Sequence, residues 1–365
     1  MEQSQWLRCC PDRRVDLPIF SYILVLLSPV LAGVGLVLGG WWTWLHPLVM
    51  YGLISVLELW WGGSEDDLPQ ESDRARGEHW FARLILWSVA PVLLVLLLGS
   101  LWRADNFSAW ELMGLTIGVG TSLGTLGING AHELGHDRGL RSKRLAELLL
   151  LLSLFMHFHV EHNRGHHVRV GTPEDPATSR EGQWLYSFWY QTLWGGMVSA
   201  WRLERDRLTR TKRSVWSLRN AMLRYGLLQT GLVIAVALWL GPAAVALWLT
   251  AAMFGILLLE TTNYFQHYGL VRRRQEDGTL ERIGPQHSWT ANHTISRAVL
   301  LNLPRHADHH LAPNRHFSNL RHLPESPVLP LGYSGMVILS LLPPIFTRVM
   351  RKRLASHRAP AGGLY

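Results

Sequence analysis

Long apolar stretches alternate with basic, histidine-rich stretches along this chain. Six of the apolar stretches run for about 20 residues with almost no charge, the length that an α-helix needs to cross the hydrocarbon core of a membrane. Trp residues lie near many of their ends, as is typical of the membrane interface. The pattern therefore predicts six membrane-spanning helices. They cover residues 19–38, 42–61, 82–102, 110–131, 223–240 and 243–263.

Two further apolar stretches are less suited to crossing a membrane. Residues 145–158 are too short and residues 331–350 are interrupted by Pro343 and Pro344, so we expect helices in or under the interface. The chain is thus expected to be an all-α, polytopic membrane protein that forms a single domain over residues 1–365. A cytoplasmic helical cap would cover its spans. The cap would comprise residues 132–222 and 264–350, followed by a tail at 351–365.

Positive charge is concentrated on one side of the predicted spans. The connections on the side opposite the N-terminus, residues 39–41, 103–109 and 241–242, hold only Arg103 of the 35 Lys and Arg in the chain. Nearly all the others lie on the other side, which the positive-inside rule places in the cytoplasm. Both termini, the acidic 62–79 loop and the histidine clusters are therefore expected there.

Composition narrows the choice of partners. The chain is 48% hydrophobic and 17% charged, with a formal net charge of +8. Because the basic residues flank membrane segments and form no separate domain, the charge favours anionic lipid headgroups over nucleic acid. Cys9 and Cys10 are adjacent, so they match neither a disulfide framework nor a Cys-x-x-Cys site and are compatible with a reducing cytosol.

Nine histidines occur in four short clusters, each at or just beyond the end of an apolar stretch. Three clusters contain a His-x-x-x-His pair, whose members share one face of a helix. Two of these carry an adjacent third His, which the same turn would present at a different angle. Since neutral imidazole is a common ligand of transition metals, and nine ligands suit two ions better than one, we expect a two-metal centre. The nine are His132, His136, His162, His166, His167, His267, His306, His309 and His310.

Polar residues near these clusters are candidates to orient the imidazoles. A ligating imidazole usually donates its second N–H to a carboxylate or a carbonyl. Several acidic residues lie within or beside the clusters, and two polar residues precede His267 on the same predicted helix. The candidates are Glu133, Glu161, Asp175, Glu260, Asn263 and Asp308.

Two other kinds of function fit part of the pattern. The stretch from His132 to His136 matches the His-Glu-x-x-His signature of zinc metalloproteases, in which Glu133 would be the base. An intramembrane zinc protease would leave most of the other histidines without a role, because it needs only three protein ligands. A metal carrier would place polar ligands inside the spans, which here hold almost no ionisable groups.

The clusters and their surroundings resemble those of integral-membrane alkane 1-monooxygenases, which belong to the histidine-rich di-iron hydroxylases and desaturases. The resemblance extends from about residue 20 to about residue 350, and its motifs are specific. They are His-Glu-Leu-Gly-His-Asp at 132–137, Glu-His-Asn-Arg-Gly-His-His-Val at 161–168, Thr-Pro-Glu-Asp-Pro at 172–176, Asn-Tyr-Phe-Gln-His-Tyr-Gly-Leu at 263–270, and Leu-Pro-Arg-His-Ala-Asp-His-His at 303–310.

The resemblance implies that the nine histidines bind two non-haem iron ions and that O2 is the co-substrate. The implied reaction is terminal hydroxylation of medium-chain n-alkanes to 1-alkanols, with reduced rubredoxin as electron donor and rubredoxin reductase upstream of it. The implied location is the bacterial inner membrane, with the active site on its cytoplasmic side.

Two details refine these expectations. Gln266 stands where alkane hydroxylases usually have Glu and resembles the xylene side-chain monooxygenases of the same superfamily. Hydroxylation of the methyl groups of xylene or toluene is therefore the alternative reaction. We further expect an acidic donor to dock on arginines that are close to the clusters in sequence. These are Arg164, Arg169, Arg305, Arg315 and Arg321.

Overall fold

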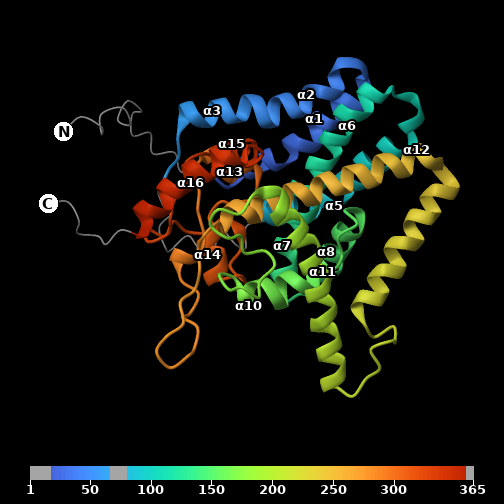
Figure 1. Cartoon of the computed structure of the whole chain (residues 1–365). Helices are drawn as coiled ribbons and strands as arrows, with labels where there is room; N and C mark the ends of the chain where they lie inside the picture. Colours follow the sequence, from blue (N-terminus) through green and yellow to red (C-terminus); the bar gives the residue numbers. More distant parts are fainter. Residues whose placement is uncertain (1–17, 66–79, 359–365) are drawn as a thin grey trace.

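The computed structural model describes residues 18–65 and 80–358, and within these ranges the chain is built from helices (Figure 1). The same ranges contain isolated β-bridges but no strand. The expected all-α fold class is confirmed. Cys9, Cys10, most of the acidic 62–79 loop and the end of the predicted tail lie outside the described residues.

Four helices in the described ranges are long and apolar enough to cross a membrane. They are η1 (Ile19–Leu26) with α1 (Leu27–Leu38); α5 (Trp80–Trp102); α6 (Ala109–Ser122) with η6 (Leu123–Ile128) and α7 (Asn129–His136); and α12 (Ala221–Gln266). α12 contains both of the last two predicted spans, because its two helical halves meet at Gly241, whose φ of 82° and ψ of −178° are not helical. The break directly before Pro242 is where the sequence separated the two spans, and Figure 1 shows the sharp bend there.

The second predicted span, residues 42–61, is helical but irregular, and it is not one of these four. It changes between 3-10, α and π turns along its length. It comprises η2 (Gly40–Trp44), α2 (Leu45–Pro47), η3 (Leu48–Leu53) and α3 (Ile54–Trp61).

Small residues bring two of the long helices into close contact. A Cβ atom on Gly120 would lie 2.6 Å from the carbonyl oxygen of Ala251, and one on Gly255 would lie 2.6 Å from the carbonyl oxygen of Gly120. Only glycine permits this approach of the two backbones. The contact holds the helix that ends at His136 against the helix that precedes His267.

The remaining helices are not among the membrane-capable ones, and all of them except η5, which joins α5 to α6, lie in the two segments expected to form the cap or in the tail that follows it. They are η5 (Ala104–Asn106), α8 (Leu140–Leu152), α9 (Phe158–Glu161), η7 (His162–His166), α10 (His167–Arg169), α11 (Leu185–Arg210), η8 (Pro285–His287), α13 (Thr294–Val299), α14 (His306–Leu311), η9 (Phe317–Asn319), α15 (Tyr333–Ser340) and α16 (Pro343–Arg358). The predicted helix at 145–158 ends earlier, at Leu152, and the one at 331–350 is divided into α15 and α16.

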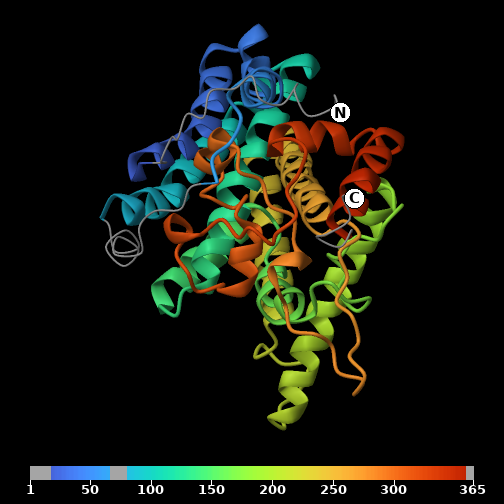
Figure 2. The same cartoon turned by 90° about the vertical axis from the view of Figure 1, so that its left-hand side faces the viewer.

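One long cap helix, α11, was not predicted from the hydrophobic pattern. Its sequence mixes aromatic, polar and basic residues, yet one face is buried at helical spacing, including Leu185, Phe188, Thr192 and Ser199. Figures 1 and 2 show that the end of α11 and the start of α12 form a hairpin that projects from the rest of the molecule.

Candidate metal centre

The nine histidines of the four clusters come together in two adjoining groups. His132, His136, His162, His167 and His309 form the first, and His166, His267, His306 and His310 form the second. Within each group the potential ligand atoms all lie within 4.8 Å of one another. All members except His136 and His167 are buried. The structure thus gathers every histidine that the sequence singled out, from four helices that lie far apart in the chain.

Each histidine is positioned by the end or start of a helix. α7 ends the long helix that begins at Ala109 and carries His132 and His136 one turn apart. α12 ends immediately before His267, whose amide donates to the carbonyl of Asn263. α14 carries the last three histidines on two turns, and His309 and its neighbour His310 enter different groups.

The expectation that His162 and His166 face the same way is wrong. Residues 162–166 form η7, a π-helical turn, in which residues five apart are aligned rather than residues four apart. His162 therefore shares a group with His167, and their Nε2 atoms are 3.0 Å apart, whereas His166 enters the other group. The π turn is what divides this cluster between the two groups.

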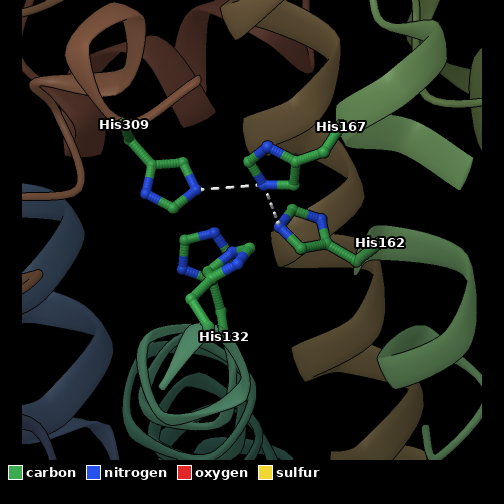
Figure 3. A group of neighbouring side chains, drawn as sticks. His132, His162, His167 and His309 are labelled. Carbon is green, nitrogen blue, oxygen red and sulfur yellow. Dashed lines mark hydrogen bonds between the residues drawn. The ribbon is translucent and has the colours of Figure 1, made fainter. Parts of the chain in front are cut away.

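The ring nitrogens within each group converge on one another. In the first group, Nε2 of His167 lies 3.0 Å from Nε2 of His162 and 3.2 Å from Nε2 of His309 (Figure 3). In the second, Nε2 of His306 lies 3.1 Å from Nε2 of His267 and 3.0 Å from Nε2 of His310. A neutral imidazole has one N–H and one lone pair, so it is not possible for all of these contacts to be hydrogen bonds.

The surroundings keep most of these imidazoles neutral. Among the seven histidines outside the membrane-capable helix Ala109–His136, burial, reinforced by the neighbouring imidazoles, holds the pKa well below its ordinary value in five. These are His162, His167, His306, His309 and His310. Burial also lowers the pKa of His267 to about 3. The neutral ring is the form that binds a metal.

Several buried ring nitrogens have no hydrogen-bond partner within the described part of the chain. They include Nε2 of His132, His136 and His166. A buried polar atom without a partner costs about 1–3 kcal/mol, and a bound cation would remove that cost. Convergent, neutral and unpartnered imidazoles fit a transition metal in each group.

Asp175 is the one predicted orienting residue that hydrogen bonds to a histidine of the two groups, as far as the described residues show. Its Oδ2 lies 2.9 Å from Nδ1 of His166 and accepts from Thr178 Oγ1 at 2.6 Å. Burial disfavours the protonated form of His166, but the carboxylate raises the pKa of that ring above its usual value. Asp175 thus holds a proton on Nδ1 and leaves Nε2 facing the group.

The other five orienting candidates bond elsewhere. Glu260 accepts from Thr192 Oγ1 at 2.7 Å and from Asn263 Nδ2 at 3.1 Å. Glu133 accepts from the amide of Phe317 at 2.8 Å. These residues would affect the histidines only indirectly, by fixing the positions of the helices that carry the histidines.

Glu161 and Asp308 bond to arginines, and these contacts change the expectation of a docking surface. Arg169 donates to Glu161 at 3.0 Å, and Arg315 forms an ion pair with Asp308. Arg164 pairs with Glu204, and Arg305 is fully buried. The expected docking surface is wrong for Arg305, because that side chain is inaccessible. Arg164, Arg169 and Arg315 stay partly exposed and pair with carboxylates of the chain, so a docking role for them stays a prediction. Arg321 has its own contacts, with its amide 2.9 Å from Asp308 Oδ2.

Residues on α11 were missed because that helix was not predicted. Ser199 donates to Glu161 at 3.1 Å, and Thr192 donates to Glu260, so the helix supports two acidic residues beside the histidines. The spacing of its buried positions is the signal that would have revealed it. The remaining histidines of the described ranges join neither group; His287, for example, bonds to Glu281 at 2.6 Å.

Three cavities border the histidines. A small one of about 20 Å³ touches both groups through His162 and His166 and is lined in part by Phe155, Phe158 and Glu260. Its volume is sufficient for about one water molecule. Two larger cavities, of about 1020 Å³ and 560 Å³, both reach His136. The first group therefore borders open space, whereas the second is enclosed.

Comparison with known proteins gives concordant results. The sequence model of the fatty acid desaturase family matches residues 108–337. The chain is 34% identical to the alkane 1-monooxygenase of Ectopseudomonas oleovorans, over 100% of this chain and 91% of that protein. It is 35% identical to alkane 1-monooxygenase 2 of Pseudomonas aeruginosa, over 87% of this chain and 85% of that protein. The hydroxylase component of the xylene/toluene monooxygenase of Pseudomonas putida is 28% identical, over 89% of this chain and 87% of that protein.

Proposed function

The chain belongs to the alkane 1-monooxygenases, within the fatty acid desaturase family, and from this premise we propose that it hydroxylates medium-chain n-alkanes at a di-iron centre. The reaction would convert the terminal methyl group to a primary alcohol. One atom of O2 would enter the alcohol, and the other would leave as water after uptake of two electrons and two protons. The gathering of nine histidines in two groups is the observation that carries the proposal.

We assign one iron to each histidine group. The first would be held by five imidazoles and the second by four, with Asp175 fixing the ring of His166. The two irons would supply the activation of O2. The protein supplies neutral ligands at fixed positions and a buried setting, and the small cavity beside His162 and His166 leaves little room for water.

The membrane placement that we propose has six spans and a cytoplasmic cap. Residues 42–61 would form the second span, and the two halves of α12 would form the fifth and sixth. The charge distribution favours the cytoplasmic face of the bacterial inner membrane for the cap, residues 132–222 and 264–350. Alkanes dissolve in the bilayer, so the spans offer a route to the histidines that does not pass through water.

We propose rubredoxin as the electron donor, reduced in turn by a rubredoxin reductase. The chain has only two Cys and no Gly-rich nucleotide motif, so neither an iron–sulfur cluster nor a nucleotide cofactor site is evident in its sequence. Electrons would therefore come from a separate protein. The net charge of +8 favours an acidic one.

Hydroxylation of xylene or toluene is the second candidate, and the likeness to the xylene/toluene monooxygenase component supports it. Labelled O2 supplied to cells that express the protein with octane or xylene distinguishes the two. We expect labelled 1-octanol as the faster product, and about two irons per purified chain. Stoichiometric zinc, or an octanol oxygen that comes from water, would refute the proposal.

A further inference from the structure

The largest of the three cavities is lined by more basic than acidic side chains, although it borders the buried histidines. Its volume is about 1020 Å³, and it lies between α8, the end of α11, the 211–220 connection and the start of α12. Seven Arg and Lys line it against three acidic residues. We call it the basic cavity.

The three acidic residues are already engaged within the protein. Glu204 accepts from Arg207 and from the amide of Ala221, and Glu147 accepts from the hydroxyl of Tyr225 at 2.7 Å. Asp137 accepts from Ser142 at 2.5 Å. Glu204 is the only one of the three that forms ion pairs with arginines in the described part of the chain, so the wall keeps an excess of four positive charges over its three carboxylates.

Several cations of the wall have no carboxylate partner anywhere in residues 18–65 and 80–358. Lys143 on α8 and Arg213 and Arg219 in the connection are exposed, and none of them forms an ion pair in these ranges. Cationic side chains that converge on one space repel one another unless an anion lies between them. The basic cavity is thus suited to an anionic group.

The connection beside the cavity also presents large apolar side chains to its surroundings. Trp216 is 78% exposed and Leu218 is 66% exposed, and the apolar helix α12 begins three residues later. Trp next to Arg at the start of an apolar helix is typical of the membrane–water interface. Figures 1 and 2 show this hairpin projecting from the body, where lipid could surround it.

An apolar track leads from the cavity along the first half of α12. Arg224 lines the cavity, and Leu228, four residues later, lies on the same face of the helix. Leu227, Leu228, Ile234 and Leu238 are all exposed. A cationic cavity that continues into an exposed apolar face matches a molecule with an anionic head and acyl chains, rather than a soluble anion or an acidic protein.

We propose that the basic cavity binds the phosphate headgroup of an anionic phospholipid, with the acyl chains along the exposed face of α12. This site rests on the membrane placement in the proposed function and not on alkane hydroxylation. Basic pockets beside membrane helices bind such headgroups, and each Lys or Arg near the surface contributes about a fivefold increase in affinity.

Native mass spectrometry of the full-length protein in mild detergent tests the site. The protein is titrated with phosphatidylglycerol or with phosphatidylcholine. We expect one phosphatidylglycerol to bind on the order of 100-fold more tightly than phosphatidylcholine. The triple variant Lys143→Gln, Arg213→Gln, Arg219→Gln should lose nearly all of this preference. Its thermal unfolding should match that of the wild type, because the three side chains are exposed.

A matched variant changes three exposed arginines elsewhere, Arg273→Gln, Arg274→Gln and Arg282→Gln, and should keep the preference. Equal binding of the two lipids by the wild type, or an equal loss in both triple variants, would overturn the proposal. So would displacement of phosphatidylglycerol by millimolar inorganic phosphate, which would indicate a site for the free anion. In the first triple variant, the KM of the enzyme for an acidic electron-donor protein could rise while lipid binding stays unchanged. That result would identify the cavity as a protein-docking surface instead. The measurement needs no turnover, so its failure is distinct from failure of the octane test.

Discussion

The carboxamide of Gln266 donates a hydrogen bond to the hydroxyl of Tyr333, with 2.7 Å between nitrogen and oxygen. Both side chains are buried, and the backbone carbonyl of Gln266 accepts from the amide of Trp289 at 2.8 Å. Tyr333 also packs edge-to-face on Phe265, in a core of aromatic residues that joins α12 to α15. Gln266 thus anchors the end of α12, the helix that presents His267, and its amide contacts this core.

This contact predicts that Gln266 is not a substrate determinant. In Gln266→Glu, the Tyr333 hydroxyl can donate to the new carboxyl group, so the ratio of octane to xylene turnover in whole cells should stay within about twofold of the wild type. Tyr333→Phe should leave the carboxamide unpaired and cost about 1–3 kcal/mol of unfolding free energy. A shift of the ratio toward octane in Gln266→Glu would restore the residue as a determinant of substrate class.

The bond between Asp175 and His166 predicts a specific sensitivity of the second histidine group. Asp175→Asn should lower iron affinity or activity by about 10–100-fold, because an amide no longer fixes the proton on Nδ1. Glu174→Gln, a change at the exposed neighbour, is the matched control and should leave both properties near wild type. Iron per chain and the rate of octane oxidation are the measurements. Equal effects of the two substitutions would remove the assigned role of Asp175.

The unequal sizes of the two groups predict unequal loss of metal. His310→Ala leaves three imidazoles in the second group, whereas His136→Ala leaves four in the first. Both should lower octane oxidation by at least about 100-fold, since even changes outside the ligands cost 10–100-fold. Iron should fall toward about one per chain in His310→Ala and stay closer to two in His136→Ala. His293→Ala, outside both groups, should keep its iron, and a loss there as large as in His310→Ala would contradict the assignment.

Glu204 predicts a pH dependence of stability. Burial alone would raise its pKa, but hydrogen bonds from Arg207, the Ala221 amide and Arg164 lower it to about 2 from the ordinary 4.5. Because solvent screens the partly exposed arginines, the charged form contributes about 1–2 kcal/mol above pH about 4.5, and this contribution is lost as the pH falls toward about 2. Unfolding of Glu204→Gln in detergent should show lower stability than wild type near neutral pH, with the difference narrowing at about pH 3. A difference that does not change with pH would refute this explanation.

The ion pair between Arg315 and Asp308 predicts that Arg315 acts on the metal centre and not on donor docking. Asp308 lies on α14 between His306 and His309. Arg315→Glu would place a second negative charge beside it and disturb the helix, so kcat should fall with little change in the KM for the electron donor. Steady-state kinetics with varied rubredoxin at fixed octane tests this, and Arg273→Glu, an exposed charge reversal far from α14 in sequence, is the control. A rise in KM alone would restore Arg315 to a docking surface.

Local sequence determined most of the long apolar helices and the histidines that form the two groups. Apolar stretches of about 20 residues can satisfy their backbone in lipid only as helices, and five of the six predicted spans coincide with helices long and apolar enough to cross a membrane. The nine histidines were identifiable because their number and their spacing in pairs are unusual, and all nine are in the two groups.

Tertiary structure decided how the nine histidines are divided between the two groups and which residues hydrogen bond to them. The π turn at 162–166 sends His162 and His166 to different groups, which a 3.6-residue period does not predict. Asp175 hydrogen bonds to His166. Arg164 and Arg169, which are close to the clusters in sequence, form ion pairs with Glu204 and Glu161. These outcomes depend on contacts between residues far apart in the chain, whose geometry is set by the packing of several helices at once.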